Sequence, residues 1–204
     1  QEESNTYREM IADAEAQIKE YRTMIKHLEE LCEGYKNILI TADKNTYAAA
    51  GYKSEKYLDG KNITKVIFPA SPLLIPNEDA IEAVMNKMDG IDLIIGIGSG
   101  VIQDLSKYVS YQTKIPYFVV ATAPSMDGYA SVGAAMITNN MKVTYTTRPP
   151  KYILADTDVL RNAPLDMIRS GYGDIIGKYS CLNDWRLSAL VNGEYLCERV
   201  MRAT

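Results

Sequence analysis

The stretch "IDLIIGIGSGVIQDLSKY", Ile91 to Tyr108, decides the fold of this chain. It begins with an apolar, β-rich run, continues through a loop with glycine at positions 96, 98 and 100, and ends in residues of helical composition. An apolar strand that enters a helix through a glycine turn is one βα unit. The stretch therefore predicts a parallel sheet whose strands are connected by helices.

The same alternation recurs on both sides of this unit. The helix that precedes it has Asn77 as its N-cap, with Glu78 and Asp79 in the first turn, where the helix dipole favours negative charge. Four strands alternating with helices indicate a Rossmann-like α/β fold, in which a parallel sheet is covered on both faces. The strands are predicted at residues 36–43, 64–70, 91–98 and 115–122, and the helices at residues 45–58, 76–88 and 100–113.

The pattern changes after Ser131. The next segment, to Arg148, is typical of a β-hairpin, residues 151–156 predict one more strand, and the chain has helical character from about Ala163. We therefore expect three parts: an N-terminal helix, an α/β domain and the beginning of an all-helical second domain, at residues 1–34, 35–162 and 163–204.

An apolar seam runs along the first part of the chain. Apolar residues recur there at alternating steps of three and four, at Ile11, Ala14, Ile18, Tyr21, Ile25, Leu28 and Cys32. The seam predicts one long helix from Tyr7 to Glu33 that Gly34 ends. A helix packed on the domain's own surface and a coiled-coil contact with another subunit both fit a narrow seam of this kind.

Composition narrows the class of protein. Of the 204 residues 47% are hydrophobic and 24% charged, with a net charge of −4 and a pI of about 5.2. These values are typical of a globular protein and give no basic field that would gather nucleic acid. No apolar run reaches the roughly 18 residues of a membrane span, and three widely spaced cysteines are typical of reduced structural thiols. We expect a soluble, cytoplasmic protein.

The glycine loop stands where open parallel sheets bind ligands, beyond the carboxyl ends of the strands. Glycine there lets backbone N–H groups approach a pyrophosphate at a helix N-terminus. The spacing is G-x-G-x-G and not the common G-x-G-x-x-G, so a tight turn without a ligand is also open. Asp43, at the end of the first strand, is equally a candidate for binding the adenosine ribose and for capping the next helix. Its charge would repel a 2′-phosphate, which favours NAD over NADP.

A second candidate loop, "TAPSMDGYAS", follows the fourth strand. Thr122 and Ser125 bring hydroxyl groups to the same rim of the sheet as the glycine loop. Asp127, next to Gly128, is either a contact for substrate hydroxyls or part of an Asx turn. The loop therefore adds a carboxylate to the predicted ligand edge.

The stretch "RSGYGDIIGKYS" supplies another carboxylate. Asp174 follows two glycines near the start of a predicted helix, and Lys178 lies four residues on, on the same face. This pattern fits an Asp174 that the helix dipole favours and that forms an ordinary ion pair with Lys178. It also fits an Asp174 that is a ligand of a divalent metal.

Taken together, "ADKNTYAAAG", "GIGSGVIQDLSKY", "TAPSMDGYAS", "ILADTDVLRNAP" and "GYGDIIGKYSCLNDWRLS" resemble the glycerol-1-phosphate dehydrogenases. These belong to the superfamily of iron-containing alcohol dehydrogenases, glycerol dehydrogenases and dehydroquinate synthases, and the resemblance runs in order from about Tyr35 to Tyr195. It implies an NAD(P)-binding domain and an all-helical domain with the active site between them. The implied enzyme interconverts dihydroxyacetone phosphate and sn-glycerol-1-phosphate with NAD(H) or NADP(H) and one Zn²⁺, Ni²⁺ or iron ion. We also expect a homo-oligomer.

The resemblance assigns roles to single residues. Asp127 and Lys178 would bind substrate, and Asp174 would bind both metal and substrate and so act in catalysis. The cofactor would be held by Asp43, Gly98, Ser99, Gly100, Val101, Ile102, Thr122, Ala123, Pro124, Ser125 and Ser131.

One departure from the family is large. Metal sites in the family add histidines to the aspartate, and these lie downstream of the equivalent of Thr204, whereas the only histidine here is His27. We therefore expect a piece of a longer enzyme, which binds NAD(H) with negligible turnover. Three alternatives remain open: a glycerol dehydrogenase for an unphosphorylated polyol, a non-catalytic nucleotide-binding module that assembles through its N-terminal helix, and a dehydroquinate-synthase-like lyase.

Overall fold

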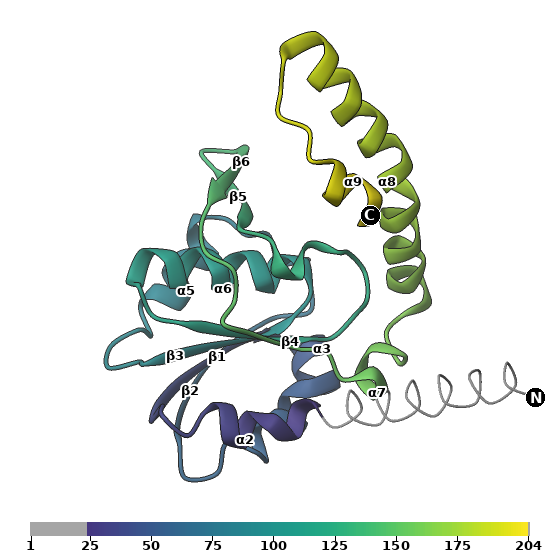
Figure 1. Ribbon diagram of the computed structural model, residues 1–204. Coiled ribbons are helices and arrows are strands. Elements are labelled where there is room, and N and C mark those ends of the chain that lie inside the picture. The colour runs from purple at the N-terminus through teal and green to yellow at the C-terminus, as the bar shows by residue number, and fades with distance from the viewer. Residues whose placement is uncertain (1–23, 204) are drawn as a thin grey trace, which may run out of the picture.

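A five-stranded parallel sheet forms the centre of the molecule in the computed structural model, which describes residues 24–203 (Figure 1). Its strands are hydrogen-bonded in the order β2-β1-β3-β4-β7. The predicted Rossmann-like α/β fold is thereby confirmed. The strands are β1 (Asn37–Asp43), β2 (Asn62–Phe68), β3 (Leu93–Gly98), β4 (Tyr117–Ala121) and β7 (Tyr152–Leu154).

The strand order reverses between β1 and β3. From β1 the chain crosses to β2 on one side, and it then returns to β3 and continues through β4 to β7 on the other side. The connections therefore leave the sheet toward opposite faces, and a crevice opens at the carboxyl ends of the two strands. Asp43 ends β1 and Gly98 ends β3, with Ala42 opposite Ile97 in the register. This crevice, where the strand order reverses between β1 and β3, is the topological switch point of the fold.

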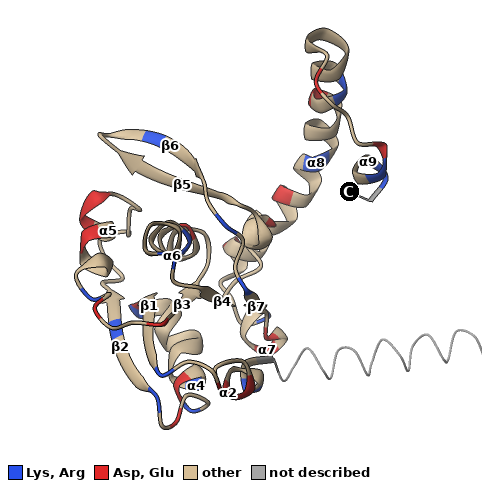
Figure 2. Ribbon diagram, turned by 60° about the vertical axis from the view of Figure 1, so that its left-hand side comes forward, with Lys and Arg blue, Asp and Glu red and all other residues tan. Residues whose placement is uncertain are grey.

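Helices cover both faces of the sheet (Figure 2). On one face α5 and α6 bury the side chains of Leu39 and Ile94, and on the other face Ile38 and Ile95 are covered by the remaining helices of the α/β part. Residues that are neighbours in a strand thus point into two different cores, as alternation requires. The helices are α5 (Glu78–Met85) and α6 (Gly100–Thr113) on the first face, and α2 (Leu28–Leu31), α3 (Lys44–Thr46), α4 (Tyr52–Glu55), α7 (Thr157–Leu160) and the short helices η1 (Met24–His27) and η2 (Tyr47–Gly51) on the second.

The described end of the N-terminal helix packs on the domain itself. Ile25, Leu28 and Cys32 are fully buried in the second core, which supports surface packing for this part of the seam. The prediction that Gly34 ends the helix is wrong. The helix α2 ends at Leu31, where the N–H of Cys32 still bonds back to the carbonyl of Leu28. The rest of the seam lies outside the described residues.

The predicted hairpin consists of β5 (Gly133–Thr138) and β6 (Met141–Thr146), which pair antiparallel. Asn139 and Asn140 connect them with φ angles of 51° and 60°, as a two-residue hairpin turn requires. The hairpin packs on α6 through Ala134 and Met136, which are buried in the first core. The hairpin thus extends the layer that α6 forms.

The chain leaves the sheet after α7 in one long helix, α8 (Leu165–Asn192), followed by α9 (Glu198–Ala203). Figure 1 shows α8 rising away from the sheet. None of its residues is buried, and Gly193, with a φ of 68°, ends it in the left-handed conformation. In the described part of the chain, no helix is long and apolar enough to cross a membrane.

Candidate functional site

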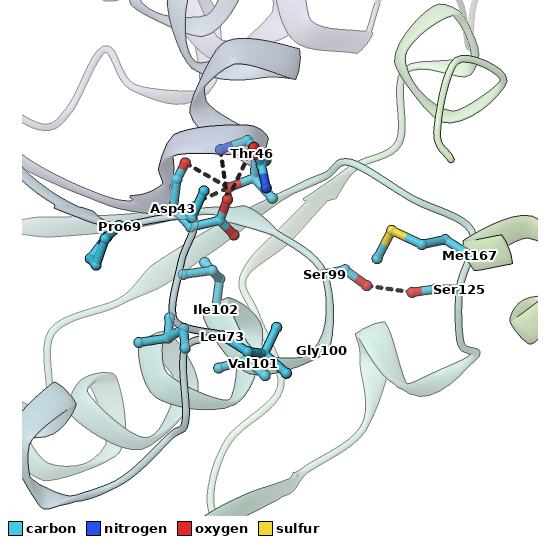
Figure 3. A pocket seen from close by; sticks show the side chains of 13 residues that line it. Asp43, Thr46, Pro69, Leu73, Ser99, Gly100, Val101, Ile102, Ser125 and Met167 are labelled. Atoms are coloured by element: carbon cyan, nitrogen blue, oxygen red, sulfur yellow. Dashed lines mark hydrogen bonds between the residues drawn. The ribbon is translucent and has the colours of Figure 1, made fainter. Parts of the chain in front are cut away.

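Two adjoining cavities open at the switch point. The first, of about 290 Å³, has Asp43 on one side and the residues from Ser99 to Ile102 on the other (Figure 3). The second, of about 600 Å³, shares Asp43 and adds Thr122 and Ala123 from the end of β4. The size of the second cavity is typical of small-molecule sites. Residues predicted from three separate stretches of sequence therefore line one continuous region.

The three glycines of the loop have different roles. A Cβ atom on Gly96 would lie 2.6 Å from Oγ of Ser106, and one on Gly98 would lie 2.6 Å from Cβ of Ile102. Both glycines therefore let α6 pack closely against β3. A Cβ on Gly100 would meet nothing within 4 Å, and Gly100 lines the first cavity. Gly98, predicted as a cofactor contact, lines neither cavity.

Asp43 caps a helix and faces the cavities at the same time. Its Oδ1 accepts hydrogen bonds from the backbone N–H groups of Asn45, at 2.8 Å, and Thr46, at 3.0 Å. The hydroxyl of Thr46 accepts from the N–H of Asp43 in return, which completes a capping box. The other oxygen, Oδ2, accepts no hydrogen bond from the described residues. The two roles considered for Asp43 are therefore compatible, one for each oxygen.

The loop after β4 is tied to the glycine loop by hydroxyl groups. Oγ of Ser99 and Oγ of Ser125 are 2.5 Å apart and share a hydrogen bond beside the first cavity (Figure 3). The hydroxyl of Tyr129 donates to the carbonyl of Ala123 at 2.8 Å. The Ser99–Ser125 bond links the two predicted ligand loops, and the Tyr129–Ala123 bond joins two parts of the loop after β4. Ser131 lies outside both cavities, where its Oγ accepts from Nζ of Lys107 at 3.0 Å.

Asp127, Asp174 and Lys178 meet at the junction of this loop with α8. Oδ2 of Asp127 is 2.5 Å from Nζ of Lys178, and the backbone N–H of Asp127 donates to Oδ2 of Asp174 at 2.9 Å. The adjacent ammonium lowers the pKa of the Asp127 carboxyl, and the carboxylate raises the pKa of Lys178. The three predicted substrate residues therefore form one cluster.

Two alternatives that the sequence left open are wrong: an Asx turn at Asp127, and an Asp174 at a helix start that pairs with Lys178. The Asp127 side chain does not cap the short helix η3 (Gly128–Ala130), so the alternative in which it forms an Asx turn there is not observed. Asp174 lies well inside α8, far from the helix start that the dipole argument assumed. Lys178 pairs with Asp127 and not with Asp174.

The contact that brings α8 to the loop is at Gly171. A Cβ atom at this position would lie 1.8 Å from the carbonyl oxygen of Pro124, so only glycine allows this approach. Pro124 and Asp127 line a third hollow together with Gly171 and Ile175. Pro124, predicted as a cofactor contact, faces α8 in this structure.

Comparison with known proteins places this architecture in a family. The family model for iron-containing alcohol dehydrogenases matches residues 16–164. The chain belongs to this family. Proteins named glycerol-1-phosphate dehydrogenase (NAD(P)+) from Bacillus velezensis and Halalkalibacterium halodurans are each 35% identical to it, over 84% and 90% of this chain and 44% and 48% of theirs. The chain thus spans about half the length of these relatives.

A solved structure supports the fold. The crystal structure of glycerol dehydrogenase from Schizosaccharomyces pombe matches with a TM-score of 0.65 at 22% identity, over 78% of this chain and 41% of that chain. At 22% identity this match is evidence for the fold of this iron-containing alcohol dehydrogenase family member alone.

The described residues do not form a complete metal site. In residues 24–203, no group of three His, Cys, Asp or Glu side chains is placed to hold an ion. Asp174 offers one carboxylate, whereas His27, the only histidine of the sequence, is exposed at the end of η1, before the first strand. One carboxylate is fewer than the three or more protein ligands that such ions need, so the described residues supply at most part of a metal site.

Sequence reasoning missed three polar groups of the site. Lys53 lines the second cavity and its Nζ lies 2.6 Å from the buried carboxylate of Asp156. Gln103 and Lys107 are buried on α6 below the loop after β4. The sequence does carry a signal for Gln103 and Lys107, because these two polar side chains, four residues apart, interrupt the apolar face of α6.

Proposed function

We propose that this chain forms the NAD(P)-binding part of an oxidoreductase that interconverts dihydroxyacetone phosphate and sn-glycerol-1-phosphate by hydride transfer. The observation that carries this proposal is the cavity at the switch point, with Asp43 from β1 and Gly100 from the β3–α6 turn on opposite sides. Dinucleotides bind at this position in open α/β sheets. The names of the relatives supply the substrate.

The cavity residues suit the parts of a dinucleotide. The pyrophosphate would lie against the backbone N–H groups at the N-terminus of α6, where Gly100 leaves room. Oδ2 of Asp43 would accept hydrogen bonds from the ribose hydroxyls, and its charge would disfavour a 2′-phosphate, so NAD is the preferred cofactor. Thr122 and Ser125 would lie along the nicotinamide half. The bound nicotinamide supplies the hydride acceptor or donor.

The cluster at the junction with α8 suits a phosphorylated polyol. Asp127 and Asp174 offer carboxylate oxygens to the substrate hydroxyls, while the ammonium of Lys178 offers a partner for an anionic group. Binding of a substrate would break the partly exposed Asp127–Lys178 ion pair, and the substrate would provide new partners for both side chains. A divalent metal is part of the proposal only in that Asp174 would be one of its ligands.

The test is a titration of the chain with NADH and with NADPH. The variant Asp43→Asn keeps the helix cap, because Asn caps helices as well as Asp, and removes only the charge. We expect the unaltered chain to bind NADH more tightly than NADPH, and Asp43→Asn to reduce that preference. If neither dinucleotide binds, the proposal is wrong. In the whole protein, faster turnover of dihydroxyacetone than of its phosphate would favour a glycerol dehydrogenase.

A further inference from the structure

The second cavity at the switch point runs along one face of the helical segment that follows β1. Thr46, Ala49 and Lys53 line this cavity at steps of three and four residues, which places them on the same side of a helix. Asp43 caps the start of the segment, whereas Lys53 lies in α4, near its end. The two charged side chains therefore lie toward opposite ends of one cavity wall.

Much of the remaining lining of this cavity is apolar. The apolar residues are Ala49 of the same helical segment and, from other segments, Leu73, Val159, Ala163, Pro164 and Met167. The ring of a nucleotide base gains from such neighbours, since removing apolar surface from water is favourable. In the proposed function Asp43 binds the adenosine ribose, so the base attached to that ribose has apolar space beside it.

Lys53 is held at this cavity by a buried carboxylate. Its Nζ lies 2.6 Å from Oδ2 of Asp156, whose side chain is 1% exposed, while the side chain of Lys53 is 41% exposed. Oδ1 of Asp156 accepts the N–H of Asp158 at 2.9 Å and so caps α7, which fixes the carboxylate. The ammonium of Lys53 thus has a set position and still opens on the cavity.

The ammonium of Lys53 has donors that the protein does not use. An ammonium group carries more than one N–H donor and no acceptor, and among the described residues Asp156 is its one hydrogen-bond partner. Lys53 is also the one cationic side chain in the described lining of the two cavities. A ligand group that pairs with it must be an acceptor, and the ring nitrogens of a purine are acceptors of this kind.

We infer that Lys53 binds the purine base of the dinucleotide by donating a hydrogen bond from its ammonium to a ring nitrogen. The inference rests on the proposed function. Asp43 then binds the ribose and Lys53 the base from one helical segment, and Asp156 is a positioning residue that holds the ammonium without touching the ligand. The base end of the site depends on the contact of α4 with the start of α7 and not on the glycine loop.

The experiment measures the dissociation constants of NADH, adenosine monophosphate and nicotinamide mononucleotide for the full chain. The purine is present in the first two ligands and absent from the third. We expect Lys53→Met to weaken binding of NADH and adenosine monophosphate about tenfold, the effect of one hydrogen bond from a charged donor, and to leave nicotinamide mononucleotide unaffected. The matched control is Lys65→Met, because Lys65 is also 41% exposed and ion-paired, with Glu55, but lines neither cavity. It should change none of these constants.

A second variant separates loss of the ligand contact from loss of the ion pair. Lys53→Met leaves the buried Asp156 carboxylate without its counter-charge, which destabilises the start of α7. Adding Asp156→Asn removes that charge and keeps the cap, because Asn caps helices as well as Asp. We expect the double variant to fold and to show the same selective loss.

Two results would contradict the inference but not the proposed function. One is unchanged binding of adenosine monophosphate by the folded variants. The other is an equal loss of affinity for nicotinamide mononucleotide, because Lys53 would then support the shape of the cavity only. Absence of NADH binding by the unaltered chain overturns both the inference and the proposed function.

Discussion

Strand β3 and helix α8 differ most strongly in how far their residues are buried. Every residue of β3 is buried, whereas none of the residues of α8 is. Large apolar side chains of α8 face solvent, among them Leu190, which is 85% exposed, and Tyr179, which is 78% exposed. The stability of β3 therefore comes from two packed cores, and that of α8 comes from its own hydrogen bonds and the contact at Gly171. The cavities at the carboxyl ends of β1 and β3 belong to the first region, and the Asp127–Lys178 cluster joins the two.

The largest expected effect tests the burial difference directly. Ile95→Ala removes a fully buried side chain from β3 and should lower the free energy of unfolding by about 2–5 kcal/mol. Leu190→Ala, in α8, should change it by less than about 0.5 kcal/mol. Urea denaturation of both variants provides the measurement. Equal losses would show that α8 is packed as tightly as the sheet.

The contact between the two regions should respond to a single methyl group. Gly171→Ala places a Cβ against the carbonyl oxygen of Pro124, and we expect it to cost about 1–3 kcal/mol of unfolding free energy as α8 is pushed off the loop. Gly173→Ala is the matched control, because its Cβ meets nothing within 4 Å, and it should stabilise the helix by up to about 1 kcal/mol. A stabilising Gly171→Ala would mean that the helix is not seated on Pro124.

The burial of the two regions can also be compared without any substitution, through the reactivity of one cysteine in each. Burial raises the pKa of Cys32, in the core that contains β3, to about 11, so only about one in a thousand of these thiols is ionised at pH 8. Cys181 is exposed on α8. A thiol reagent at pH 8 should label Cys181 within minutes and leave Cys32 unlabelled until the protein unfolds. Labelling of Cys32 at the same rate would place it outside the core.

The elements that sequence analysis predicted best are those with the strongest local pattern. The strands β1, β3 and β4 are continuous apolar runs, and Asn77 caps α5 through the N–H of Ala80 as predicted. Their boundaries are set by residues that are adjacent in the chain. Local chemistry was therefore sufficient to predict the sheet and the edge at which the cavities open.

The errors concern contacts between distant segments. Two glycines suggested that a helix begins near Asp174, but Gly171 lies within α8 because the carbonyl of Pro124 occupies the space of a side chain. Spacing also does not reveal that Gly98 lets α6 pack closely on β3, since a Cβ there would lie 2.6 Å from Cβ of Ile102. The pairing of Lys178 with Asp127 depends on the same distant contact. None of these neighbours can be identified from spacing in one sequence.

The most direct test of the central claim is NADH binding by the variant Gly100→Val. The Cβ at this position meets nothing in the protein, so the free energy of unfolding should stay the same, whereas the pyrophosphate would lose its close approach to the backbone. The dinucleotide account predicts at least about a tenfold loss of NADH affinity in a fully folded variant. Undiminished NADH binding to a folded Gly100→Val protein would contradict it.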